Sequence, residues 1–193
     1  MSDISASVVI AYHSGYGHTT RLAEAVHEGA ASVSGVTVEM ITVEEVSEED
    51  WSRLDAADAI IFGSPTYMGT ASPAFHTFAH DTAGRWSAQA WKDKIAAGFT
   101  TSGAMSGDKL NTLQYFTVLA AQHGMYWVNL DLLPGTEETD LNRIGGWLGA
   151  MAQCPGREGP EMMKKADLLT ASHLGQRVAE HTLLLRRARA LAA

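Results

Sequence analysis

The sequence predicts a single doubly wound α/β domain, in which a five-stranded parallel sheet carries helices on both faces. Five short apolar segments recur along the chain, and amphipathic helical segments lie between them. Strands that alternate with helices form a parallel sheet. The 193 residues suffice for one such domain but fall short of the roughly 250 residues of an eight-stranded α/β barrel.

The predicted strands differ in how deeply they should be buried. Residues 7–12 (SVVIAY) are apolar on both faces, as expected for a central strand of a parallel sheet. Residues 37–42 (TVEMIT) alternate between apolar and polar side chains, which indicates a strand nearer an edge. The other predicted strands are residues 58–63 (DAIIFG), 94–100 (KIAAGFT) and 125–130 (MYWVNL).

Four segments are predicted to be helices. Residues 19–32 place four apolar side chains on one helical stripe. Residues 72–82 begin with a Ser-Pro pair that suits an N-cap and a first turn, and residues 109–123 stop before Gly124. The fourth predicted helix covers residues 162–192.

Residues 132–161 show no clear periodicity and contain three prolines and several glycines. The stretch is too long for a tight turn. We therefore expect an irregular insertion that either covers the active site or forms an assembly surface.

The composition excludes several classes of partner. With 14 basic and 22 acidic residues the formal net charge is −8, which argues against duplex nucleic acid and anionic membranes. The single cysteine, Cys154, excludes an intramolecular disulfide and is expected to be a small buried or loop residue. The sequence shows no signal peptide and no membrane-spanning run. We expect a cytoplasmic protein without nucleic-acid binding or membrane insertion.

The six residues after the first strand form a candidate phosphate-binding loop. Two glycines allow a tight turn, two hydroxyls add donors, and the next helix directs its positive dipole end at the same point. The loop lacks the lysine of a nucleoside-triphosphate loop and the G-x-G-x-x-G pattern of a Rossmann dinucleotide site, so it suits a terminal monophosphate. Taken alone, it could also be an ordinary turn that caps a helix. Its residues are Ser14, Gly15, Tyr16, Gly17, His18 and Thr19.

Two further loops should lie at the same edge, because ligands of doubly wound sheets sit outside the carboxyl ends of the strands. After the third strand, a proline-stiffened and partly apolar segment offers a ledge for a flat ring, although Tyr67 and Met68 could instead pack into the core. This segment is Pro65, Thr66, Tyr67, Met68 and Gly69. After the fourth strand, small residues would let the backbone approach the ring edge; they are Thr101, Ser102, Gly103, Ala104, Met105 and Ser106.

Four segments, residues 8–26, 63–86, 99–113 and 122–125, together resemble the WrbA type of flavodoxin-like NAD(P)H:quinone oxidoreductases. The similarity covers about residues 7–150. It implies a flavodoxin-like sheet in the order 2-1-3-4-5, non-covalent FMN, NAD(P)H as electron donor and a quinone-like acceptor. It also implies a homo-oligomer, either a dimer or a tetramer.

The resemblance also assigns roles to residues. Residues 14–19 would hold the FMN phosphate, with Tyr16 on the nicotinamide or substrate side. Residues 66–68 would line the isoalloxazine, and residues 101–106 would wrap the ring edge. His123 would lie beside the flavin and donate a hydrogen bond to the quinone, and Trp86 would border the substrate pocket, in the same or a neighbouring subunit. A histidine at a helix end also interacts favourably with the helix dipole, which is an alternative explanation for His123.

The sequence departs from the family pattern in three places. Tyr67 stands where the family usually has a basic residue, which puts the use of a nicotinamide donor in question. Residues 43–57 form a shorter segment than is usual. Ala104, Met105 and Asp108 replace glycines in the third loop, and Asp108 would disfavour an anionic substrate.

Two functions compete. The first is a two-electron reductase that passes electrons from NAD(P)H through FMN to a quinone. The alternative is a flavodoxin-like carrier without NAD(P)H turnover, which the acidity favours and the insertion disfavours. A phosphoreceiver would need acidic residues at His13 and Ser64, and no G-x-S-x-G pentapeptide of a serine hydrolase is present. His76 and His80 lack a third ligand, so we expect no metal site.

Overall fold

The computed structural model describes residues 4–155 and 158–192; Gly156 and Arg157, which belong to the predicted insertion, lie outside the described residues. The strands are β1 (Ala6–Tyr12), β2 (Val36–Thr42), β3 (Ala59–Tyr67), β4 (Thr70–Ala71), β5 (Ile95–Ser102), β6 (Tyr126–Trp127) and β7 (Ala150–Gln153). The helices are α1 (His18–Ala31), α2 (Glu48–Ala56), α3 (Pro73–Asp81), α4 (Ala83–Ser87), α5 (Lys109–Gln122) and α6 (Lys165–Ala192), with a 3₁₀ turn at Pro160–Met162.

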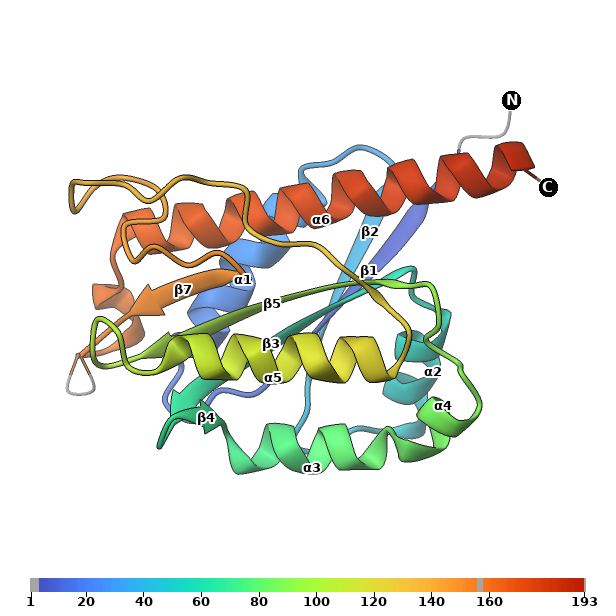
Figure 1. The fold of residues 1–193 in the computed structure, drawn as a ribbon, viewed down its shortest axis with the longest axis horizontal. Helices are drawn as coiled ribbons and strands as arrows, with labels where there is room; N and C mark the ends of the chain where they lie inside the picture. Colours follow the sequence, from blue (N-terminus) through green and yellow to red (C-terminus); the bar gives the residue numbers. More distant parts are fainter. Residues whose placement is uncertain (1–3, 156–157, 193) are drawn as a thin grey trace.

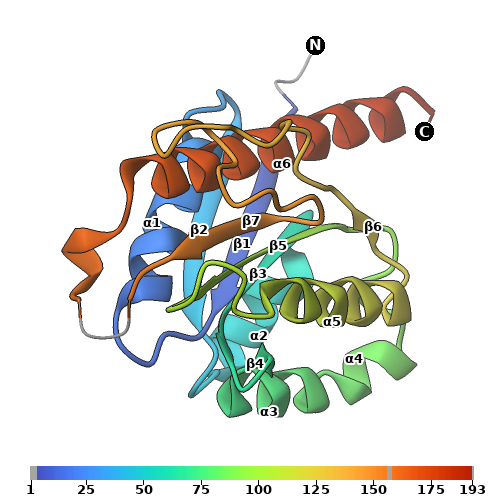
Figure 2. The ribbon, with the colours of Figure 1, turned by 60° about the vertical axis from the view of Figure 1, so that its left-hand side comes forward.

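The main sheet is parallel and has the strand order β2-β1-β3-β5-β6. Helices α1 and α6 cover one face, and α2, α3, α4 and α5 lie on the other (Figures 1 and 2). A separate apolar core fills each side: Leu22, Val26 and Leu174 belong to one, and Phe75 and Phe116 to the other. The prediction of a doubly wound sheet in the order 2-1-3-4-5 is confirmed, with β4 and β7 as additional strands.

The fifth strand of the sheet is split in two. Strand β6 pairs with the beginning of β5, and β7 pairs with its end, from Phe99↔Ala150 to Ser102↔Gln153. The predicted strand over residues 125–130 is therefore correct at only two positions, and the insertion predicted as irregular contains the second half of the strand. The sequence of β7, AMAQ, is too short to show a period.

Helix α2 was not among the predicted elements. It begins at a capping box in which the Ser47 side chain accepts the Asp50 N–H while the Asp50 carboxylate accepts the Ser47 N–H. Trp51 and Leu54 are its only buried residues, so its apolar stripe is too narrow to stand out in the sequence.

Helices α1 and α6 pack backbone against backbone. A Cβ at Gly29 would lie 1.8 Å from the Ser172 carbonyl oxygen, and one at Gly175 would lie 2.0 Å from that of Val26. Glycine is therefore required at both positions, because any side chain would separate the two helices.

Among the helices in residues 4–155 and 158–192, none combines the length and the apolar character that crossing a membrane would need.

Candidate functional site

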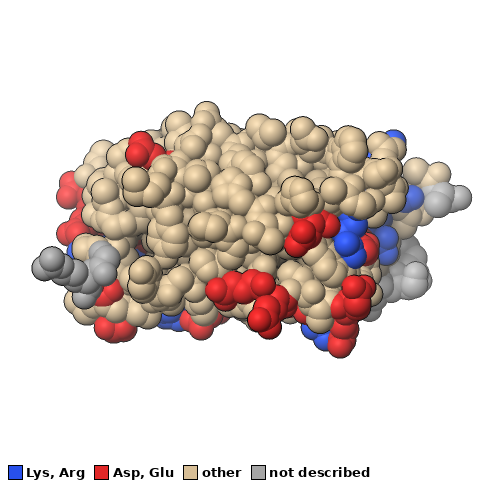
Figure 3. Space-filling view, turned by 90° about the horizontal axis from the view of Figure 1, so that it is seen from below, with Lys and Arg blue, Asp and Glu red and all other residues tan. Residues whose placement is uncertain are grey.

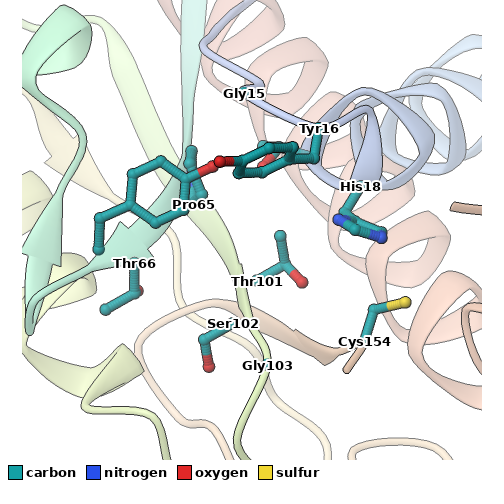
Figure 4. A pocket seen from close by; sticks show the side chains of 11 residues that line it. Gly15, Tyr16, His18, Pro65, Thr66, Thr101, Ser102, Gly103 and Cys154 are labelled. Atoms are coloured by element: carbon teal, nitrogen blue, oxygen red, sulfur yellow. The ribbon is translucent and has the colours of Figure 1, made fainter. Parts of the chain in front are cut away.

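A cavity of about 240 Å³ opens at the carboxyl edge of the sheet, where the three predicted loops meet. Figure 4 shows Thr101 in its middle, with Pro65 and Thr66 on one side and His18 and Cys154 on the other. The lining residues are Gly15, Tyr16, His18, Thr19, Pro65, Thr66, Tyr67, Thr101, Ser102, Gly103 and Cys154.

The first loop shapes the start of α1 for an anion. Gly17 is the N-cap residue and adopts a left-handed conformation with φ +85°, which favours glycine. The Ser14 hydroxyl accepts the Thr20 N–H at 3.1 Å, so Ser14 supports the loop without lining the cavity. The first turn contains no acidic residue. The other amide groups of the first turn and the dipole of α1 therefore remain available to a phosphate.

The first and second loops approach each other closely. A Cβ at Gly15 would lie 2.5 Å from the Tyr67 hydroxyl oxygen, so a larger residue there would displace the Tyr67 ring. The rings of Tyr16 and Tyr67 lie edge to face, with centroids 6.4 Å apart. Burial and the neighbouring Tyr16 raise the pKa of Tyr67, which keeps its phenol neutral. The two tyrosines form an uncharged aromatic wall at the mouth of the cavity.

The second loop is held from behind by a chain of hydroxyls. The Thr66 hydroxyl lies 2.8 Å from those of both Thr100 and Thr112. Pro65 and Thr66 lie in β3, which extends four residues beyond the predicted strand. Met68 has φ 48° and a fully exposed side chain, and neither it nor Gly69 lines the cavity. The structure therefore places Met68 and Gly69 outside the cavity lining, and contact between Met68 and the ring stays a prediction.

Thr101 carries the clearest sign of a missing ligand. The residue is buried, and its hydroxyl oxygen has no hydrogen-bond partner among the described residues. A buried hydroxyl without a partner is costly, so such a group points to a ligand atom in the cavity. The polar and aromatic lining around it fits a flat heterocycle that carries carbonyl and N–H groups.

The residues of the third loop line two different hollows. Ser102 and Gly103 line the cavity, whereas Met105 and Ser106 line an adjacent hollow of about 550 Å³ beside Trp147. Ala104 lines neither; its carbonyl oxygen accepts a hydrogen bond from Lys109. Only the first half of the predicted ring-edge segment therefore faces the cavity.

Cys154 and Lys109 were not predicted as residues of the site. Burial and the neighbouring carboxylates of Glu158, Glu161 and Asp167 raise the pKa of the Cys154 thiol, so it is an unreactive wall of the cavity. Cys154 directly follows β7, whose sequence shows no periodicity. Lys109 is, from the sequence, an ordinary first residue of a predicted helix. Neither carried a signal that would have revealed its position.

His123 and Trp86 lie at the opposite end of the molecule. Helix α5 runs antiparallel to the strands, and its 14 residues span about 21 Å. His123 is buried just beyond the end of α5, 2.9 Å from the Thr82 hydroxyl, and its ring packs against Trp91 at an interplanar angle of 34°. Trp86 and His123 instead line a separate hollow of about 380 Å³. The prediction that His123 lies beside the flavin is therefore not met within one chain, because α5 carries it away from the carboxyl edge.

Within the described parts of the chain, no group of three or more His, Cys, Asp or Glu side chains is arranged to hold a metal ion. His76 instead contacts the Thr70 hydroxyl at 3.2 Å and packs on Tyr115.

The fold and the cavity together define a flavodoxin-like protein with a site that fits a flavin mononucleotide. Residues 6–134 match the model of the NADPH-dependent FMN reductase family, and the chain belongs to this family. It is an NAD(P)H-dependent flavin oxidoreductase that holds FMN non-covalently. The predicted family, cofactor and class of enzyme are confirmed.

Similar proteins include a flavodoxin and an NAD(P)H dehydrogenase (quinone). Flavodoxin FldP of Pseudomonas aeruginosa is 39% identical over 89% of this chain and 94% of its own. An NAD(P)H dehydrogenase (quinone) of Aromatoleum aromaticum is 31% identical over 95% and 99%, respectively. The crystal structure of a flavodoxin, WrbA-like protein from Agrobacterium tumefaciens has a TM-score of 0.75 and 42% identity, covering 92% of this chain and 98% of that one.

Proposed function

We propose that the protein transfers two electrons from NAD(P)H to a quinone-like acceptor, with FMN in the cavity where the three loops meet. The observation that carries the proposal is the buried Thr101 hydroxyl, which lacks a partner among the described residues and lies in the middle of this cavity. Bound FMN supplies the redox chemistry, and the protein supplies position, shape and electrostatics.

Each loop has a separate task in holding the cofactor. The amides at the start of α1, with Thr19, hold the phosphate. Pro65, Thr66 and Tyr67 line one side of the ring. Thr101, Ser102 and Gly103 bind its polar edge.

The open side of the cavity receives donor and acceptor in turn. Tyr16 is 77% exposed and forms the aromatic wall together with Tyr67, which suits a flat, uncharged molecule. Among the described residues, no lysine or arginine lines the cavity, and Asp108 adds negative charge near the third loop. These features favour a neutral quinone over an anionic acceptor.

A second copy of the chain would complete the site with Trp86 and His123. Leu110–Gln122 contains no charged residue, and α3 contains only Asp81. Figure 3 shows this side of the molecule with a broad uncharged region, and its charged side chains gather elsewhere. Trp86 and Val118 are more than half exposed there. An uncharged, partly apolar face on an acidic protein is typical of contacts between subunits, in a dimer or a tetramer.

Steady-state kinetics test the proposal. The FMN-loaded protein is assayed with NADPH or NADH and a series of neutral and anionic quinones. We expect turnover with parallel double-reciprocal lines, because donor and acceptor use one cavity in turn, and a preference for neutral quinones. Binding of FMN without turnover of either nicotinamide would instead support the carrier function, to which the similarity to Flavodoxin FldP points. Sedimentation velocity tests the oligomer in the same preparation.

A further inference from the structure

Lys109, the first residue of α5, is fully buried beneath the third loop. Its Nζ lies 2.8 Å from Ser102 Oγ, 2.9 Å from the Ala104 carbonyl oxygen and 2.9 Å from that of Met105. An ammonium group has three hydrogens, so these three acceptors use all of them. The loop therefore closes around a buried cation.

This position is unfavourable for a lysine in two respects. The amino end of a helix carries a partial positive charge and favours carboxylates. Burial also penalises the charged form, and it lowers the pKa of Lys109 to about 8. We therefore expect Lys109 to have a role other than stabilising the protein without its ligand.

The charge of Lys109 is not neutralised by a direct ion pair with any described residue. The nearby Asp167 carboxylate is paired with Arg143 instead: its two oxygens accept hydrogen bonds from Arg143 at 2.8 and 2.7 Å. One of these oxygens also accepts the Gln153 N–H. The immediate neighbours of the ammonium are a hydroxyl and two carbonyls, all neutral.

Ser102 links this cation to the FMN cavity. Its hydroxyl accepts from Lys109 and donates to the Ala104 carbonyl oxygen at 3.1 Å, and Ser102 itself lines the cavity. The ammonium thus lies one hydrogen bond behind the cavity wall. A fixed positive charge there stabilises whichever state of the ligand is richer in electrons.

We propose that Lys109 is a positioning residue that holds residues 102–107 in shape and raises the midpoint potential of the bound FMN. The proposal rests on the FMN site described above. It assigns a role in the redox chemistry to a side chain that never touches the cofactor.

The chain provides a matched control for this test. Lys94 is also buried and also donates to three oxygens, the carbonyls of Leu54, Asp55 and Ala57, but it lies at the amino end of β5, away from the cavity. Lys94→Met therefore removes an equivalent buried cation without changing the charge behind the wall. Lys109→Met removes the charge and all donors, and Lys109→Gln removes the charge but keeps two donors.

The dissociation constant of FMN and the midpoint potential are measured for all four proteins. We expect both Lys109 variants to bind reduced FMN about tenfold less tightly relative to oxidised FMN, which lowers a two-electron potential by about 30 mV. Lys94→Met should keep the wild-type potential. Lys109 variants with the affinity and potential of Lys94→Met would overturn the proposal. Failure of the wild type to bind FMN would refute the FMN site itself, which is a separate result.

Two remaining outcomes are also decisive. Folded Lys109 variants that take up no FMN, while Lys94→Met does, would support the positioning role. If the Lys109 variants do not fold, the wild-type potential is followed from pH 7 to 10. The slope of the midpoint potential against pH should then change as Lys109 loses its proton. A constant slope over this pH range would overturn the proposal.

Discussion

The Nε2 atom of His123 lies 2.9 Å from the hydroxyl oxygen of Thr82, and this contact holds the histidine at the amino end of the sheet. Thr82 donates its own hydrogen to the Ala79 carbonyl oxygen at 2.7 Å, so it accepts from His123. A proton therefore lies on Nε2, and burial, which lowers the pKa of His123, favours the neutral ring. Its Nδ1 atom is buried without a partner among the described residues. In this arrangement His123 lies away from the cavity of its own chain, at the opposite edge of the sheet.

Acid should destabilise the protein through this histidine. Burial lowers the pKa of His123 below 6.5, so just below that pH the unfolded chain binds a proton that the folded chain does not. Stability is then lost as pH falls below about 6.5, at up to about 1.4 kcal/mol per pH unit. Urea unfolding of wild type and His123→Asn at pH 7.5 and 5.5 checks this. An equal loss in both proteins would contradict it.

Gly175→Ala should separate α1 from α6. The added Cβ would meet the Val26 carbonyl oxygen at 2.0 Å, and a backbone atom in a packed helix pair cannot yield without cost. We expect a loss of about 2–3 kcal/mol in the free energy of unfolding. Gly84→Ala is the control, because nothing lies within 4 Å of its Cβ, and it should be neutral or slightly stabilising. Equal effects of the two substitutions would argue against the close contact.

Thr101→Val should separate stability from FMN binding. The hydroxyl makes no hydrogen bond in the described structure, so its loss should leave the apoprotein as stable or about 1 kcal/mol more stable. The same change should weaken FMN binding about tenfold, because a buried ligand atom loses its partner. Thr112→Val gives the contrast: it breaks a 2.8 Å hydrogen bond with Thr66 and should cost about 1 kcal/mol. Unchanged FMN affinity in Thr101→Val would remove Thr101 from the site.

Lys94→Met should weaken the end of α2. The ammonium is the donor to three carbonyl oxygens at the carboxyl end of that helix, and methionine leaves them without one. Thermal or urea unfolding should show a loss of about 2–3 kcal/mol. Lys92→Met, at an exposed position, should stay within about 0.5 kcal/mol of wild type. A neutral Lys94→Met would mean that water replaces the ammonium.

Most of the sheet could be predicted because the strands β1, β2, β3 and β5 carry apolar runs that helices separate. The split of the fifth strand could not be predicted, because β6 has only two residues and β7 only four, and their positions depend on pairing with β5. Helix α2 was not predicted for a similar reason, because its two buried residues do not form a recognisable apolar stripe.

The site was predictable where it depends on strand ends and not where it depends on helix direction. Gly15, Thr66 and Thr101 follow or end strands, and parallel strands bring their ends together. His123 comes from the far end of α5, so its position depends on the course of a whole helix. Lys109 depends on a side chain that folds back under its own loop, which no local pattern records.

The central claim is an FMN oxidoreductase that accepts electrons from NAD(P)H, and its most direct test is the visible spectrum under anaerobic conditions. The purified protein is saturated with FMN, freed of excess cofactor, and titrated first with NADPH and then with a neutral quinone. We expect one FMN per chain, bleaching of the flavin absorption by NADPH and its recovery with quinone. A protein that retains no FMN, or that retains FMN which NADPH and NADH both fail to bleach, would contradict the account.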